Sequence, residues 1–402
     1  MKRISLVWFL IFILLVSFSS GFFAFRSVNA KPSIIDWYSS GGHPRYKDDN
    51  KDVMYLVEKG DLIEFSVTVD EPANFSWEVN KIEQNETSNR FTFSVPEEDG
   101  IYEIHVTAYN EFGESHHEWV ISTLSEEEAP DIFDYFTDKK SFNRSMTDPW
   151  NRTLPEWSGG SEYAPHVSKG FVDSSEGETW ASISSSIAYG TWRFKYRFPE
   201  AMERCGGEGF GFTYIRAYGE NWGSYSFSQC CDSHHHCVIS HSEAEFSIDY
   251  DDGVVLRDNW YTVTIIRTRD GWIYMFRDDR IEFLAHDNKV NTSESIFLSI
   301  VGPDSPKRYF DCLEVYADKY LFPNKGIFYG EYVSNYYCQN SKSYPIKKSG
   351  IIVRGRNATL AKIADAINNP SLFTYNPVTR TADCYTNLVV DEGAQLSLKL
   401  RK

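Results

Sequence analysis

The stretch IAYGTWRFKYRF, residues 187–198, is the part of the sequence that decides the fold. Large aromatic side chains occupy every second position of its second half, at Trp192, Phe194, Tyr196 and Phe198. An apolar residue at every second position is typical of a β-strand that turns one face to a core. We therefore expect a strand here, with its aromatic face packed inside a β-sandwich.

The composition extends this expectation to the whole chain. Phe, Trp and Tyr make up 16% of the 402 residues, about double the share in an ordinary globular chain, and these residues favour strands. An all-β protein of two or three domains is therefore expected, and a helical bundle or a wholly disordered chain is excluded. The 57 Asp and Glu residues outnumber the 40 Lys and Arg residues, for a net charge of -17. This acidity argues against a nucleic-acid partner, because neutralising phosphates requires clustered Lys and Arg.

Four further strand-like stretches follow the first one along the chain. They are GFGFTYI (209–215), NWYTVTIIR (259–267), DGWIYMFRDD (270–279) and YFDCLEVY (309–316). With the first stretch, this succession over residues 132–322 resembles the concanavalin A-like jelly roll of lectins and glucanases, in its laminin-G-like branch. The resemblance implies a two-sheet sandwich that binds carbohydrate or protein on a curved sheet face. Some members of that family hydrolyse glycans.

A shorter region, residues 31–124, precedes the jelly roll. Its apolar residues also alternate along short strands separated by turns, as in a β-sandwich. The stretch from Asp99 to Gly113 resembles the tyrosine-corner strand of immunoglobulin-like domains, which makes Tyr102 the corner tyrosine and Trp77 the tryptophan of strand C. The two cysteines of true immunoglobulins are missing. The region is therefore similar to the disulfide-free immunoglobulin/PKD type of archaeal and bacterial surface proteins, whose usual role is a spacer.

Two further regions complete the domain plan. Residues 125–131 contain an acidic run followed by a proline, which indicates a solvated linker. Residues 323–402 predict a small α+β module, with one short amphipathic helix over 360–367 between strand-like pieces. This module resembles the lead-in to the right-handed parallel β-helices of archaeal surface proteins. A single rung cannot bury its apolar face alone, so the module either packs on the sandwich or begins a longer surface protein.

The first thirty residues predict export. Basic Lys2 and Arg3 precede an apolar run over residues 6–16, and residues 28–30 supply the small side chains of a cleavage site, so the mature chain would begin at Lys31. An uncleaved anchor is the alternative, because the apolar segment is also long enough to span a bilayer. Either way the protein is expected to be secreted or on the cell surface. It would contact the membrane only through this segment, if the segment stays uncleaved.

Six Asn-X-Ser/Thr sequons agree with export, since they predict N-glycosylation on exposed loops of an exported protein. The acceptor residues are Asn74, Asn85, Asn143, Asn151, Asn291 and Asn357.

A cluster of cysteines and histidines occupies residues 230–241, on an insertion between two predicted strands. Disulfides are the first alternative for this cluster, because the compartment is oxidising. The expected pairs are Cys205 with one of Cys230 and Cys231, the other of these two with Cys237, and Cys338 with Cys384, which leaves Cys312 over. A Zn²⁺ or Cu²⁺ site is the second alternative, and an exposed histidine run is the third. The candidate metal ligands are Cys230, Cys231, His234, His236 and Cys237.

The carboxylates between residues 243 and 252 bear on catalysis and on calcium. Laminarinase-type jelly rolls carry Glu-x-Asp-x-Glu on one strand, and the closest match here is Ser247-Ile248-Asp249-Tyr250-Asp251. This match lacks the nucleophile and shortens the acid, so a non-catalytic protein is favoured over a glycoside-active enzyme. The same run provides the candidate ligands of a calcium site, at Asp249, Asp251 and Asp252, although Asp-Asp-Gly is also an ordinary turn.

Trp222 and Tyr225 are the aromatic residues that we expect to contact a ligand. They belong to a glycine-containing run over residues 218–225 that predicts a loop, whereas most aromatic residues are expected in the core. The sequence thus predicts an exported, non-catalytic protein that binds a carbohydrate or a cell-surface protein through its sandwich, with Ca²⁺ as the one cofactor considered. A glycoside-active enzyme and a structural envelope component without a dedicated ligand are the alternatives.

Overall fold

The computed structural model of the protein describes residues 30–40, 43–47, 53–134, 148–150, 152, 155, 157–158, 166–168, 171–173, 179–197, 210–219, 222–229, 234–241, 244–251, 259–300, 309–334, 346–354 and 358–390. This part of the chain is almost entirely β, which confirms the all-β prediction. The chain divides into two units, residues 1–123 and 124–402.

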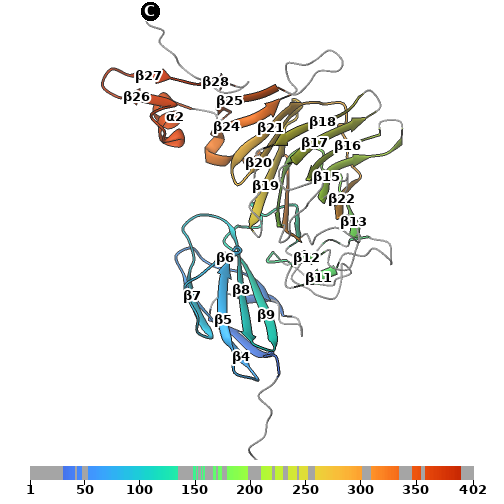
Figure 1. Ribbon diagram of the computed structural model, residues 1–402, viewed down its shortest axis with the longest axis vertical. Helices are drawn as coiled ribbons and strands as arrows, with labels where there is room; N and C mark the ends of the chain where they lie inside the picture. The colour runs from blue at the N-terminus through green and yellow to red at the C-terminus, as the bar shows by residue number, and fades with distance from the viewer. Residues whose placement is uncertain are drawn as a thin grey trace, which may run out of the picture. The chain divides into compact units, whose positions relative to one another are not determined.

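Two β-sheets form the first unit, whose strands are drawn blue to cyan in Figure 1. The smaller sheet has the order β1-β4-β7, with β1 at Ile34–Ser39, β4 at Leu62–Val69 and β7 at Arg90–Ser94. The larger sheet has the order β2-β3-β9-β8-β5-β6. Its strands are β2 (His43–Lys47), β3 (Val53–Leu56), β5 (Asn74–Val79), β6 (Ile82–Glu83), β8 (Ile101–Asn110) and β9 (Gly113–Ser122).

An aromatic cluster forms the core of the first unit. Trp77 and Trp119 are fully buried and stack with ring centroids 6.0 Å apart, and Phe65 packs on Trp119 at 4.9 Å. The Tyr102 hydroxyl donates a hydrogen bond of 3.0 Å to the carbonyl oxygen of Glu98. A corner tyrosine bonds to the backbone a few residues upstream in the same way. Membership of the immunoglobulin/PKD type itself stays a prediction.

The second unit contains two larger sheets (Figure 1). The eleven-stranded sheet has the order β11-β12-β23-β14-β19-β20-β21-β24-β25-β28, with β10 also paired to β23. The strands before the C-terminal region are β10 (Ile132–Asp134), β11 (His166–Ser168), β12 (Phe171–Asp173), β14 (Gly190–Arg197), β19 (Trp260–Arg267), β20 (Trp272–Arg277), β21 (Arg280–His286) and β23 (Tyr309–Ala317).

The six-stranded sheet has the order β13-β22-β15-β16-β17-β18. All its neighbouring strands pair antiparallel. Its strands are β13 (Thr179–Ser184), β15 (Phe210–Ala217), β16 (Gly223–Gln229), β17 (His234–His241), β18 (Ala244–Asp251) and β22 (Ser295–Ile300).

The stretch that opens the sequence analysis is strand β14, and its alternation builds the core between these two sheets. Trp192, Phe194 and Tyr196 are fully buried, as predicted. Phe194 packs against Phe212 of the six-stranded sheet with ring centroids 4.4 Å apart. Burying an aromatic side chain of this size stabilises the fold by about 1.5–3 kcal/mol. Phe198 lies outside the described residues.

Gly190 opens β14 in a conformation that requires glycine. Its φ is +141°, in the range where side chains are disfavoured, and a Cβ atom there would lie 2.0 Å from the carbonyl oxygen of Tyr316. The neighbouring strand β23 can therefore approach β14 closely only because residue 190 has no side chain.

The C-terminal strands continue the eleven-stranded sheet. Strand β24 (Ile327–Ser334) pairs parallel with β21, and β25 (Ile346–Val353) pairs antiparallel with β24 and parallel with β28 (Asn387–Val390). Helix α2 (Leu360–Ile367) follows as expected and buries Ile363 in a small apolar core with Ile351. The 3-10 helix η2 (Pro323–Gly326) and a hairpin of β26 (Phe373–Asn376) and β27 (Thr381–Cys384) complete this region. The resemblance to a β-helix lead-in is not confirmed.

Candidate functional site

The outer face of the six-stranded sheet is the surface on which we build a candidate site. Residues of a strand alternate between the two faces of a sheet. Every second residue faces the core of the second unit, and Ala181, Phe212 and Leu298 have 0% of their surface exposed there. The alternate residues of β13, β22, β15 and β16 are less buried and lie on the outer face. Most of these outward residues are serine or threonine, with a few aromatic residues among them.

Four outward side chains form a continuous row across β13, β22 and the end of β15. Trp180 and Phe297 stack with ring centroids 6.1 Å apart and ring planes at 25°. The Arg216 guanidinium lies 4.9 Å from the ring centre of Phe297 and 5.1 Å from that of Tyr218. We call Trp180, Phe297, Arg216 and Tyr218 the aromatic ladder. Since 52% of Tyr218 is exposed, the ladder reaches the open surface.

A β-bulge puts Arg216 on the outer face. The register of β15 shifts after Thr213 relative to both of its neighbouring strands. Tyr214 and Ile215, two consecutive residues, are consequently both buried in the core at 0% exposure. Without the extra residue, strict alternation from Thr213 would place Arg216 on the core face. Because of the bulge, the side chain of Arg216 lies on the outer face of the sheet.

Hydroxyl groups flank the aromatic ladder. The Thr213 and Ser226 hydroxyl oxygens are 2.9 Å apart on neighbouring strands of this face. Ser295 lies opposite Arg216 in the pairing of β15 with β22. Its buried hydroxyl has no hydrogen-bond partner within the part of the chain that the structure describes. The partly exposed hydroxyls of Thr213 and Ser226 are suited to exchanging hydrogen bonds with a polyhydroxylated ligand.

The charge of Arg216 stands out in an acidic protein. The chain carries a net charge of -17, yet no carboxylate among the described residues pairs with this guanidinium, whose recorded neighbours are two aromatic rings. Guanidinium groups bind carboxylates through two parallel hydrogen bonds. The ladder thus combines ring faces for stacking with a cation that is available for an anion.

Trp222 and Tyr225, the predicted ligand contacts, lie in different surroundings. Trp222 is 46% exposed and lies between β15 and β16, outside both strands. The prediction that Tyr225 lies on a loop is wrong: it is an inward residue of β16 and is fully buried. Its hydroxyl donates to the Asp287 carboxylate and accepts from the backbone N–H of Val290 at 3.2 Å. Burial raises the pKa of the Tyr225 hydroxyl well above its ordinary value.

Sequence reasoning missed all four ladder residues as ligand contacts. An available signal was the alternation itself, because Trp180 precedes inward Ala181 and Phe297 separates inward Ile296 from Leu298. Large aromatic residues at outward positions are the exception on such strands, and several of them side by side are typical of an interaction surface. The outward position of Arg216 could not be predicted in this way, because the alternation of apolar residues does not show where a bulge occurs.

The predicted disulfides receive no support from the cysteines that the structure describes. Cys237 and Cys384 both have free thiols, so their expected pairings are corrected. Cys237 is an inward residue of β17 and packs in the core, where burial raises the pKa of its thiol to about 12. Cys384 is exposed, and its thiol donates to the Thr386 carbonyl oxygen at 3.2 Å. Cys312, the cysteine left over, is buried on β23.

The remaining cysteines and the acidic run are placed as follows. Cys205, Cys230, Cys231 and Cys338 lie outside the described residues, as does Asp252. The backbone of His234 and His236 belongs to β17, and that of Asp249 and Asp251 to β18. The calcium site at these aspartates stays a prediction.

Three of the six predicted glycosylation acceptors can be located. Asn74, Asn85 and Asn291 are exposed, as an acceptor must be. Asn143, Asn151 and Asn357 lie outside the described residues, together with the predicted signal segment over residues 1–29. Among the residues that the structure does describe, we find no helix with the length and apolar character needed to cross a membrane.

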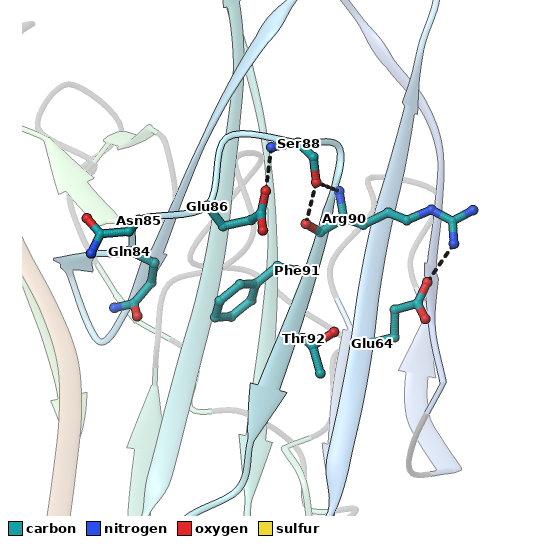
Figure 2. A pocket seen from close by; sticks show the side chains of 8 residues that line it. All are labelled: Glu64, Gln84, Asn85, Glu86, Ser88, Arg90, Phe91 and Thr92. Atoms are coloured by element: carbon teal, nitrogen blue, oxygen red, sulfur yellow. Dashed lines mark hydrogen bonds and ion pairs between the residues drawn. The ribbon is translucent and has the colours of Figure 1, made fainter.

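A shallow groove of about 560 Å³ on the first unit is a weaker candidate site. Figure 2 shows Arg90 pointing away from Glu86 and toward Glu64, with which it forms an ion pair of 2.9 Å. Glu86 accepts hydrogen bonds from the backbone N–H groups of Thr87 and Ser88, and the bond from Ser88 lowers the pKa of its carboxyl group. The groove therefore satisfies its own charges, whereas the Arg216 cation is left for a ligand.

No family model and no curated protein matches the sequence. Among solved structures, the carbohydrate binding module CBM66 from Bacillus subtilis is similar at 14% identity and a TM-score of 0.28, over 40% of this chain and 89% of the module. A Bacillus licheniformis beta-glucanase is similar at 8% identity and a TM-score of 0.33, over 40% of this chain and 91% of the enzyme. The receptor binding domain of botulinum neurotoxin type G is similar at 10% identity and a TM-score of 0.37; 55% of this chain matches 62% of that domain.

Proposed function

We propose that the protein is a non-catalytic glycan-binding protein of the cell surface and that the aromatic ladder is its binding face. The observation that carries this proposal is the row of Trp180, Phe297, Arg216 and Tyr218 on a serine- and threonine-rich sheet face. Sugar rings present apolar C–H faces that pack on aromatic rings, and their hydroxyl groups exchange hydrogen bonds with serine and threonine.

The ligand class that the ladder favours is an acidic sugar. Arg216 sits within the row of rings, so a sugar stacked on Phe297 or Tyr218 would bring its ring substituents next to the guanidinium. A carboxylate at that position forms charge-assisted hydrogen bonds, which a neutral hydroxymethyl group cannot match. We therefore expect a polymer of uronic acids to bind more tightly than its neutral counterpart.

The rest of the proposal concerns the organisation and location of the protein. The first unit serves as an immunoglobulin/PKD-like spacer, and the second unit is a concanavalin A-like sandwich that presents the ladder. The N-terminal segment directs export, and the exposed asparagines Asn74, Asn85 and Asn291 carry glycans where the cell has the machinery. Six sequons and a basic-apolar-small N-terminal pattern support this part.

Binding of matched oligosaccharides tests the proposal. Residues 31–402 are titrated calorimetrically with an oligogalacturonate and with an oligogalactoside, each with calcium and with a chelator. We expect the acidic sugar to bind and Arg216→Gln to weaken it by about 10- to 150-fold, the loss of a hydrogen bond to a charged group. Trp180→Ala should weaken both sugars by about 2- to 10-fold, the worth of an aromatic stack.

Tyr109→Ala supplies the matched control, because Tyr109 is a comparably exposed aromatic residue of the first unit. Unchanged binding in Arg216→Gln and Trp180→Ala would contradict the ladder as the site. Release of reducing sugar would favour the glycoside-active enzyme instead. Failure to bind any glycan on an array, with calcium or without it, would favour a structural envelope component.

A further inference from the structure

Asn74, the acceptor of the first sequon, lies directly opposite Tyr109 in the pairing of β5 with β8. The next residues along, Phe75 and Ala108, are also register partners and pack in the core of the first unit. Since successive residues of a strand point to opposite faces, Asn74 and Tyr109 share the outer face of the sheet. Both are exposed, Tyr109 to 41%. Directly opposite residues have Cβ atoms about 4.5–5.5 Å apart, so these two side chains are immediate neighbours.

The surroundings of Asn74 are open on one side and fixed on the other. Strand β5 pairs with β6 only through Glu78 and Val79, so no strand among the described residues lies on the far side of Asn74. The side-chain amide of Asn110 donates to the carbonyl oxygen of Pro72 at 3.4 Å, which ties the residue after Tyr109 to the segment that leads into Asn74. A group attached to Asn74 therefore has room beside an aromatic ring whose position is held.

We propose that the glycan on Asn74 packs its first sugar ring on Tyr109 and thereby stabilises the pairing of β5 with β8. This inference rests on the N-glycosylation included in the proposed function above, and it selects one acceptor as the structural one. Of the three acceptors that the structure describes, Asn74 alone belongs to a strand, whereas Asn85 and Asn291 lie outside the strands and have no register partner.

The covalent attachment is what makes a single ring sufficient. The apolar C–H face of a sugar packs on an aromatic ring, as in the ladder, but one exposed ring does not repay the entropy that a free sugar loses on binding. A sugar attached to the neighbouring asparagine is held beside the ring at an effective concentration in the millimolar range or above, so most of that cost is already met. Tyr109 is therefore expected to contact the attached glycan and not a free oligosaccharide.

Hydrogen exchange of a defined glycoform is the first test. Residues 31–402 are secreted from a eukaryotic host that attaches oligomannose glycans, and endoglycosidase H then leaves one N-acetylglucosamine on each modified asparagine. We expect Asn74 to be modified, and the amides that pair β5 with β8 to exchange about 2- to 10-fold more slowly than in Asn74→Gln, the worth of an aromatic stack. Asn85→Gln is the matched control, because Asn85 is likewise exposed but lies outside the strands. It should leave exchange of the β5 and β8 amides unchanged.

Variants of Tyr109 separate the ring from the glycan. Tyr109→Ala should remove the difference in exchange between the glycosylated protein and Asn74→Gln, and Tyr109→Phe should keep it, because packing requires the ring and not the hydroxyl. A nuclear Overhauser effect between the Tyr109 ring protons and the N-acetylglucosamine provides a readout that needs no variant.

Three results would overturn the proposal. The first is a modified Asn74 whose sugar leaves exchange unchanged, and the second is an unmodified Asn74 in a protein that carries a glycan at Asn85 or Asn291. The third, no glycan at any asparagine, would also contradict the glycosylation part of the proposed function. Since no free glycan enters these experiments, their outcome is independent of whether the aromatic ladder binds a ligand.

Discussion

Tyr225→Phe tests the reassignment of a predicted ligand contact to the core. The phenol lies between β16 and the segment after β21, where its hydroxyl donates to Asp287 and accepts from the N–H of Val290. The Arg267 guanidinium lies 4.6 Å from the centre of the same ring and donates to the carbonyl oxygen of Ala188 at 2.8 Å. Phenylalanine keeps the ring and its packing and removes only the hydroxyl.

Two hydrogen bonds set the size of the effect. A bond to a charged group contributes about 1.5–3 kcal/mol, and a buried N–H left without an acceptor costs about 1–3 kcal/mol. Val290 is 2% exposed, so water cannot readily replace the hydroxyl. The Asp287 carboxylate still accepts from the N–H of Lys289 at 3.0 Å, which reduces the first contribution. We expect Tyr225→Phe to lower the free energy of unfolding by about 2–4 kcal/mol.

Urea unfolding of the parent and the variant measures this difference from the shift of the midpoint at equal slope. Hydrogen exchange adds a local readout, because the amide of Val290 should lose protection in the variant. Tyr218→Phe is the control, since 52% of Tyr218 is exposed and its change should stay within about 0.5 kcal/mol. A change below about 0.5 kcal/mol for Tyr225→Phe, combined with weaker glycan binding, would refute the core assignment and restore Tyr225 as a ligand contact.

Three further predictions follow from single contacts. Cys237 should react with a thiol reagent only after unfolding, because its side chain is fully buried; rapid labelling of Cys237 itself in the native protein, located by peptide mapping, would show that β17 is paired in another register. Gly190→Ala should lower the free energy of unfolding by more than about 1 kcal/mol, because its Cβ would collide with a β23 carbonyl oxygen; an unchanged midpoint would count against this pairing. Burial raises the pKa of Asp270, but hydrogen bonds from Thr268 and the charge of Arg354 outweigh it and leave that pKa below its ordinary value. The carboxylate therefore stabilises the fold above its unfolded pKa of about 4 and loses that effect as the pH falls further. We expect Arg354→Ala to lower the free energy of unfolding, measured by hydrogen exchange, by more at pH 7 than in acid; a loss that is equal at both pH values would count against the ion pair with Asp270.

The fold was predictable where alternation is uninterrupted. In β14 the aromatic residues at 192, 194 and 196 all reach the core, and buried residues alternate in the same way along β16. The parallel pairings that add β24 and β28 to the sheet were not predictable, because nothing in the local pattern states which distant strand a segment joins. The sequence therefore left open whether the C-terminal module, residues 323–402, packs on the sandwich or begins a solenoid, because the answer depends on those pairings.

The candidate site was less predictable than the fold, for physical reasons that differ from residue to residue. Tyr225 follows Gly223 and resembles a loop residue, but long-range pairing with β15 and β17 makes its segment a central strand. Arg216 reaches the outer face through a bulge, which is a property of two paired strands and not of one.

The two faces of the six-stranded sheet separate stability from binding, and this separation is what makes the proposed variants informative. Inward residues such as Phe212 and Ile239 are fully buried, so their substitution would change the fold before it changed any site. Trp180 and Arg216 lie on the outer face, where removing a stack or a cation–π contact costs about 0.5–1.5 kcal/mol. That is small against the stability of a sheet anchored by an aromatic core. A loss of ligand binding in an outer-face variant that unfolds like the parent therefore reports on the site itself. If a variant lost both ligand binding and stability against unfolding, the substituted residue would instead be one that stabilises the core.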